Sequence, residues 1–367
     1  MTHRRTWQAV GVAGGFAGAA ATGAAVSLAA RRRLGAVVDR RRLATQLSTG
    51  ADDTGALPPG QPSSVTADDG VRLSCEEIEA LNGRAELTVV LVHGFALDRR
   101  TWHFQRRFLS ELAAPAVRQV IYDQRSHGRS ERAARASCTI EQLGRDLDAV
   151  LRTLAPDGPL VLVGHSMGGM TIMALAEQRP DLFADRVLGV AFVSTSAGEV
   201  GGRGLPATLL SRRNPLTRAV GLLAGWQPAV VTSVRRVGHD LIWAVTRRFA
   251  YGDRRVDPAR VDLVDAMISA NAVDALTDFV DTIGTHDRIA ALPALVDCEV
   301  LVAAGAADQV IPFRHSERIA DELPHATLLR LPGVGHLPML EQPEVVDGAL
   351  TDLLRRCARR LASRRRA

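Results

Sequence analysis

The chain has 367 residues, of which 46% are apolar and 23% charged, and this composition excludes disorder over most of its length. Its four cysteines form no CxxC motif and no Cys/His cluster, so neither a zinc site nor a disulfide framework is expected. The net charge is +5; all basic residues are arginines, and their excess gathers at the two ends of the chain. No nucleic-acid-binding motif accompanies them, which favours an anionic membrane surface over nucleic acid as their partner.

The first 49 residues are predicted to form an apolar segment with an arginine-rich flank. Residues 6–30 carry no charged side chain, and a helix of this length, about 37 Å at roughly 1.5 Å per residue, can cross a bilayer. The favoured interpretation is a membrane anchor. Two arginines precede this run and six follow it, at 31–33 and 40–42, so the positive-inside rule would then place the folded domain on the cytoplasmic side. A cleaved export signal, indicated by the paired arginines at 4–5, and a soluble arm are the alternatives.

Residues 50–64 are rich in glycine, proline and aspartate and are predicted to be a linker. Beyond it, short β-branched runs alternate with helical stretches, which predicts an α/β protein with a mainly parallel sheet covered by helices on both faces. The predicted strands are 88–92, 117–122, 160–163, 186–193, 299–303 and 327–331. The alternation breaks at 198–293, where apolar residues follow helical spacing, so a helical cap is expected between two parts of the core, 65–197 and 294–367.

A glycine-rich motif between a predicted strand and a predicted helix carries the strongest chemical signal. Residues 164–169 read GHSMGG, which contains the G-x-S-x-G pattern of a nucleophile elbow. So tight a turn needs glycine on both sides of the serine, because a Cβ there would collide with the neighbouring strand or helix. The turn would lift Ser166 above the sheet at the N-terminus of the next helix, where unpaired N–H groups favour negative charge. We therefore predict that Ser166 is a nucleophile.

The chain resembles the α/β-hydrolase superfamily from about residue 65 to residue 354. HGF at 93–95 is similar to the family's HG-x oxyanion turn, and DQRSHGRS at 123–130 resembles its D-x-R-G-H-G-x-S loop, although Ser126 stands where glycine is usual. SMGG at 166–169 resembles the elbow of monoglyceride-lipase-like and cofactor-free haloperoxidase-like members. The resemblance implies the α/β-hydrolase fold, with an eight-stranded, mainly parallel sheet and the helical cap inserted after strand 6. It also implies an oxyanion hole made by the backbone N–H groups of Phe95 and Met167, and no metal or organic cofactor.

Two further catalytic groups are expected after the nucleophile, because this fold orders them as serine, acid and histidine. His336, in the sequence GVGHLP, is the predicted base, since the flanking glycines allow a loop to project its imidazole. Asp308, in the sequence GAADQVIP, matches the family's G-x-x-D-x-x-x-P turn after a strand and is the predicted acid. His315 and His325 are weaker candidates for the base, and Glu199 is a weaker candidate for the acid.

These residues predict a serine hydrolase that cleaves a carboxylic ester through an acyl-enzyme. Serine at the elbow disfavours epoxide hydrolases and haloalkane dehalogenases, which form their intermediate on an aspartate. Haloperoxidase-like or perhydrolase chemistry, C–C bond hydrolysis and acyl transfer to another alcohol stay open; a non-catalytic receptor or scaffold is disfavoured because all three catalytic positions are filled. Apolar residues of the predicted cap at 209–210, 222–223 and 230–231 favour a lipid-like acyl group, unless they form the cap's own core.

The last predicted helix ends in an arginine-rich tail. Leu350, Leu354, Cys357 and Leu361 have heptad spacing, and most of the nearby arginines fall on other faces. This pattern predicts a helix packed on the sheet with a solvated tail, and attraction of the tail to an anionic membrane surface is the alternative. The expected partners are therefore a small-molecule ester or lipid and a membrane surface, but not nucleic acid.

Overall fold

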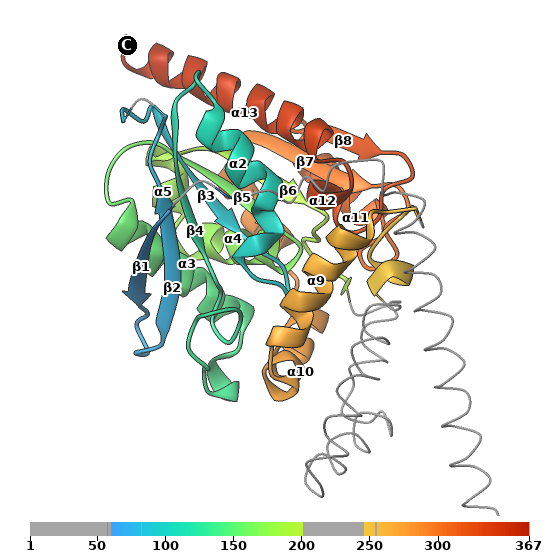
Figure 1. Cartoon of the computed structure of the whole chain (residues 1–367). Coiled ribbons are helices and arrows are strands. Elements are labelled where there is room, and N and C mark those ends of the chain that lie inside the picture. Colours follow the sequence, from blue (N-terminus) through green and yellow to red (C-terminus); the bar gives the residue numbers. More distant parts are fainter. Residues whose placement is uncertain (1–56, 58–59, 82, 201–245, 254, 367) are drawn as a thin grey trace, which may run out of the picture.

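The computed structural model describes residues 57, 60–81, 83–200, 246–253 and 255–366 of the chain (Figure 1). The predicted membrane anchor at 6–30 lies outside these residues, as do the apolar pairs of the predicted cap at 209–210, 222–223 and 230–231. Within the described ranges, no helix combines the length and the apolar character needed to cross a membrane.

In the described part of the chain, eight strands form one sheet, in the order β1-β2-β4-β3-β5-β6-β7-β8. Strand β2 runs antiparallel to β1 and β4, and all other neighbouring strands are parallel. The strands are β1 (Gln61–Thr66), β2 (Arg72–Ile78), β3 (Leu87–Val92), β4 (Val117–Tyr122), β5 (Leu160–His165), β6 (Val187–Val193), β7 (Glu299–Gly305) and β8 (Thr327–Leu331). The expected α/β-hydrolase fold with a mainly parallel, eight-stranded sheet is therefore confirmed.

The last six strands coincide with the predicted ones, whereas β1 and β2 have no counterpart among the β-branched runs. Strand β1 begins at Gln61, so the sheet starts inside the stretch 50–64 that was predicted to be a linker. In β1 only Val65 is buried, and in β2 the buried Leu73 and Cys75 alternate with polar residues. Antiparallel strands with one solvated face show such alternation, and they lack the continuous apolar run of the buried parallel strands.

Helices cover both faces of the sheet, as predicted (Figure 1). Alternate residues of a strand point to opposite faces, so Val89 and Leu91 of β3 join one core cluster, and Val90 and Val92 join the other. The first face carries α2 (His103–Glu111), α9 (Pro258–Ala270), α12 (Pro338–Glu341) and α13 (Pro343–Arg364), with the 3-10 helix η1 (Arg99–Trp102). The second face carries α3 (Ile140–Leu154), α4 (Met167–Gln178), α5 (Pro180–Asp185), α11 (Arg314–Glu322) and the 3-10 helix η4 (Ile289–Leu295). A further 3-10 helix, η2 (Arg135–Ser137), precedes α3.

The insertion between β6 and β7 contains the helices α9 and α10 (Val273–Gly284) in its described part. This agrees with a helical cap inserted after strand 6. Helix α9 begins after Asp257, whose carboxylate accepts a hydrogen bond from the N–H of Ala259 at 2.9 Å. Helix η4 spans the predicted end of the cap at residue 293, and its Leu292 and Leu295 are buried in the core of the second face.

The turn between β5 and α4 is packed tightly against the neighbouring strand. A Cβ on Gly168 would lie 2.3 Å from the carbonyl oxygen of Val92, and a Cβ on Gly164 would lie 2.6 Å from the backbone of Gly168. Both distances are far shorter than a van der Waals contact, and the atoms that would be met belong to the backbone. Glycine is therefore what allows α4 to begin this close to the end of β3.

Gly168→Ala is expected to lower the free energy of unfolding by about 3 kcal/mol, because the backbone of Val92 must move to admit the methyl group. The matched control is Gly348→Ala on α13, where an added Cβ meets nothing within 4 Å. That change is expected to be neutral or to stabilise the protein by up to about 1 kcal/mol, since alanine is the better helix former. Urea denaturation measures both values, and a Gly168→Ala variant as stable as the wild type would contradict the account of the turn.

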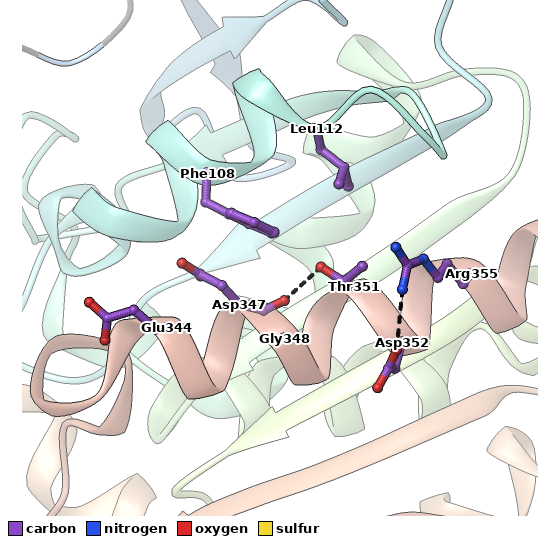
Figure 2. Close-up of a pocket in the computed structure, with 8 residues that line it drawn as sticks. All are labelled: Phe108, Leu112, Glu344, Asp347, Gly348, Thr351, Asp352 and Arg355. Atoms are coloured by element: carbon purple, nitrogen blue, oxygen red, sulfur yellow. Dashed lines mark hydrogen bonds and ion pairs between the residues drawn. The ribbon is translucent and has the colours of Figure 1, made fainter.

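A cavity of about 560 Å³ lies between α2 and α13 (Figure 2). Phe108 of α2 and Leu112, directly after α2, line it opposite the acidic side chains of Glu344, Asp347 and Asp352 on α13. The predicted catalytic residues Ser166, Asp308 and His336 are not among the residues that line this cavity. Asp347, one of the acidic residues that line the cavity, is only 9% exposed, so the charge on its carboxyl affects the stability of the fold.

The stability of the fold is expected to depend on pH through Asp347. This side chain accepts a hydrogen bond from Gln105 Nε2 at 3.0 Å, but burial, together with the charge of Glu344, raises the pKa of its carboxyl to about 7. Because this pKa lies above the unfolded value of about 3.9, the folded chain binds the proton more tightly, and stability falls as the pH rises from about 4 to about 7.

Asp347→Asn keeps an acceptor oxygen for Gln105 and removes the charge. The free energy of unfolding should therefore rise by on the order of 2 kcal/mol at pH 8, and by much less at pH 5. Urea denaturation at the two pH values measures the difference. Asp352→Asn is the charge-matched control, because Asp352 lines the same cavity but is largely exposed beside Arg355. An Asp347→Asn variant that keeps the wild-type pH dependence would exclude this carboxyl as its source.

Candidate active site

Ser166 occupies the turn between β5 and α4, at the edge of the sheet where the parallel strands end. Its backbone has φ 51° and ψ −117°, a conformation that is rare outside glycine and stores strain. The N–H of Ser166 donates to the carbonyl of Val193 at 2.9 Å, and the hydroxyl of Thr195 donates to the carbonyl of Ser166 at 2.7 Å. Because α4 begins at Met167, the first N–H groups of the helix, which have no acceptor within it, lie beside this serine.

Asp308 and His336 are joined by a hydrogen bond although 28 positions separate them in the chain. Nδ1 of His336 donates to Oδ2 of Asp308 at 2.8 Å. The other carboxylate oxygen accepts from the backbone N–H groups of Val310 at 2.8 Å and Ile311 at 2.9 Å, so the turn after β7 fixes the aspartate. With its proton held at Nδ1, the imidazole is free to accept a second proton at Nε2 while the carboxylate keeps the ring oriented.

His165 links the serine turn to the loop of His336, a contact that no sequence pattern indicates. Its Nε2 donates to the carbonyl oxygen of His336 at 2.9 Å, and the centroids of the two imidazole rings lie 4.8 Å apart. Burial lowers the pKa of His165 well below 6.5, so this ring is neutral. Among the described residues, no hydrogen bond joins Ser166 Oγ directly to the ring of His336. Such bonds are often long in the absence of substrate and shorten when it binds.

Glu341, which is not among the residues predicted from the sequence, holds the loop of His336 from the other side. Its carboxylate accepts from the N–H groups of Gly335 and Gly252, both at 2.8 Å. The N–H of His336 itself donates to the carbonyl of Ala250 at 2.7 Å. Burial raises the pKa of Glu341, and the backbone donors oppose that rise. Glu341 binds only backbone N–H groups here, so no pattern of side chains in the sequence points to it.

The loop after β3 brings Phe95 close to Ser166. A Cβ on the preceding Gly94 would lie 3.1 Å from the Cβ of Ser166, so this loop and the serine turn are in contact. His93 is fully buried, and both of its ring nitrogens are hydrogen-bonded within the protein. Burial lowers the pKa of His93 to about 4, so its neutral ring supports the loop rather than transferring protons. Phe95 and Met167 therefore approach Ser166 from two separate segments, the loop after β3 and the start of α4.

Ser126 takes the backbone shape of the glycine that it replaces in the 123–130 loop. Its φ is 62°, in the left-handed region, and its hydroxyl accepts a hydrogen bond from the N–H of Ala133 at 3.0 Å. The preceding Arg125 is fully buried and pairs with Asp146 at 2.6 Å and Asp69 at 2.7 Å. These contacts hold the loop together in spite of the missing glycine.

The weaker sequence candidates occupy other surroundings. His315 contacts the hydroxyl of Ser196 at 2.9 Å, and His325 contacts a backbone carbonyl at 3.1 Å. Glu199 is exposed and forms an ion pair with Arg318 at 2.8 Å. Within the described residues, none of the three is hydrogen-bonded to the carboxylate–imidazole pair.

A model of the alpha/beta hydrolase family matches residues 89–349. A protein of Variovorax paradoxus that is provisionally named a carbamate hydrolase is 28% identical over 277 residues, which cover 73% of this chain and 91% of that protein. The sn-1-specific diacylglycerol lipase of Mus musculus is 26% identical over 294 residues, covering 75% of this chain and 83% of the lipase. Among solved structures, a thermophilic esterase from Thermogutta terrifontis matches with a TM-score of 0.63 and 27% identity, covering 81% of this chain and 99% of the esterase. Since the family model spans most of the chain, and the sheet order and the serine turn agree with it, the protein belongs to the alpha/beta hydrolase family of hydrolytic enzymes.

Proposed function

We propose that the protein is a serine hydrolase that cleaves a carboxylic ester with an apolar acyl group, through an acyl-enzyme on Ser166. The observation that carries the proposal is the 2.8 Å hydrogen bond between His336 Nδ1 and Asp308 Oδ2, at the edge of the sheet where a strained turn presents Ser166. A serine hydroxyl is a weak nucleophile at neutral pH and needs a base that a carboxylate orients. This pair supplies that base.

In the proposed reaction, Ser166 Oγ attacks the carbonyl carbon of the ester while Nε2 of His336 takes the hydroxyl proton. The backbone N–H groups of Phe95 and Met167 stabilise the negative oxygen that forms, with a contribution on the order of 3 kcal/mol per donor. The bond to the alcohol oxygen then breaks, and the alcohol leaves with the proton from His336. Water attacks the acyl-enzyme in the same way, gives its proton to His336, and releases the acid and the free serine.

The preference for an apolar acyl group rests on the side chains around the proposed oxyanion hole. Met167 belongs to a buried apolar cluster that also contains Phe279 of α10. Phe95, Val310 and Ile283 pack against this cluster and are only partly buried, so part of the apolar surface around Met167 stays accessible. The names of the relatives described above give different substrates. We therefore base the proposed substrate class on these residues of the chain itself.

A fluorophosphonate probe is expected to label the wild type and to leave Ser166→Ala unlabelled, because the probe reacts with an activated serine. Asp308→Asn should retain the fold but lose about 10³- to 10⁴-fold in kcat, since the imidazole is then held in the wrong tautomer. Ser110→Ala is the control, because its hydroxyl caps a carbonyl of α2 away from the site. Equal labelling of the wild type and Ser166→Ala would remove the nucleophile assignment.

Esters of p-nitrophenol with acyl chains of increasing length test the substrate class. We expect kcat/KM to rise by about tenfold or more from acetate to octanoate, because each buried methylene is worth about 0.8 kcal/mol of transfer free energy and part of this is realised in binding. The corresponding p-nitrophenyl carbamates serve as the comparison. Faster cleavage of the carbamates, or a preference for charged acyl groups, would contradict the apolar ester.

A further inference from the structure

We infer that Asn271, in the cap, is a positioning residue that holds the proposed oxyanion loop in its active shape; this inference rests on the proposed function. Asn271 lies between α9 and α10, which meet at an angle at one side of the sheet (Figure 1). Its side-chain amide donates two hydrogen bonds, one to the carbonyl of Met267 at 2.8 Å and one to the carbonyl of Ala96 at 2.9 Å. The first ends helix α9, and the second reaches across to the loop after β3.

The carbonyl that Asn271 holds belongs to a strained residue. Ala96 has φ 62°, in the left-handed region that alanine rarely adopts, and it directly follows Phe95. The Phe95 N–H shares its peptide group with the carbonyl of Gly94, which accepts from Nδ1 of His93 at 2.8 Å and from the N–H of Leu97 at 3.3 Å. That N–H of Leu97 shares its peptide group with the carbonyl of Ala96, so Asn271 restrains the donor that helps to fix the direction of the Phe95 N–H. His93 belongs to the core, whereas Asn271 belongs to the cap.

A second contact ties the cap to the same loop. Phe279 of α10 is fully buried in the cluster that contains Met167. Its ring lies 5.3 Å from the ring of His127, which lies 6.0 Å from the ring of Phe95. The cap is therefore packed against both residues whose N–H groups form the proposed oxyanion hole. Packing alone does not set the orientation of a peptide group. The hydrogen bond from Asn271 to the carbonyl of Ala96 supplies that orientation.

This arrangement predicts a kinetic effect that differs from simple loss of stability. Donors that are oriented in advance stabilise the charge that develops in the transition state. Without Asn271, the backbone of Ala96 can relax toward negative φ, the Leu97 N–H can leave the carbonyl of Gly94, and the peptide group that carries the Phe95 N–H is less firmly oriented. The transition state then loses more stabilisation than the bound substrate does, so kcat should fall while KM changes little.

The experiment compares Asn271→Ala and the isosteric Asn271→Asp, both of which remove the two N–H donors, with the control Asp257→Ala. Asp257 caps the N-terminus of the same helix α9 but does not contact the loop after β3, so its loss weakens the cap alone. For both Asn271 variants we expect kcat on p-nitrophenyl octanoate to fall at least tenfold with KM within twofold of the wild type. Inhibition by an alkyl trifluoromethyl ketone, which forms a tetrahedral oxyanion on the serine, should weaken by the same factor as kcat/KM. Asp257→Ala should lower the Tm and keep kcat within twofold.

Two results would overturn the inference: wild-type kcat in both Asn271 variants, or the same loss of kcat in Asp257→Ala at an equal loss of Tm. Failure of the proposed function looks different, because the wild type would then neither hydrolyse the ester nor react with a fluorophosphonate. An active wild type with unaffected Asn271 variants would leave the serine hydrolase in place and remove only the role of Asn271.

Discussion

The close approach of α4 to β3 is the constraint on which the site depends. The backbone of Gly168 lies so near the carbonyl of Val92 that no side chain fits between them. This contact brings the start of α4 to the end of the sheet and forces Ser166 into its strained turn. The loop that carries Phe95 follows directly after Val92, so the same contact sets the distance between the serine and that loop. A single packing requirement in the sheet thus places two of the elements that the proposed chemistry needs.

The loop of His336 is held from several directions, and each contact comes from a different part of the chain. Asp308 orients the ring from the turn after β7, and His165 binds the carbonyl of His336 from the end of β5. Glu341 binds the loop from α12, and the carbonyl of Ala250 accepts the N–H of His336 itself. Ordering this loop costs conformational entropy, and these hydrogen bonds offset that cost. Ala250 precedes α9, so the cap also contributes to the position of this loop.

The sequence reveals the parts of the fold and site that have a local signature. The parallel strands are continuous β-branched runs, and Ser166, Asp308 and His336 each lie in a short glycine-containing pattern. Strand β1 has one buried residue and therefore no such signature, which is why its start lies within the predicted linker. His165, Glu341 and Asn271 could not be assigned their contacts, because each binds a backbone group that is distant in sequence or in another element. Hydrogen bonds of this kind leave no periodic trace in the chain.

The acyl-enzyme on Ser166 can be observed directly. The wild-type protein is mixed rapidly with p-nitrophenyl octanoate and quenched in acid, and the peptide that contains Ser166 is then analysed by mass spectrometry. We expect a burst of p-nitrophenol equal to the enzyme concentration and an octanoyl group on Ser166 during turnover. Steady hydrolysis of the ester with the acyl group on another residue, or with no covalent intermediate and no burst, would contradict the proposed acyl-enzyme.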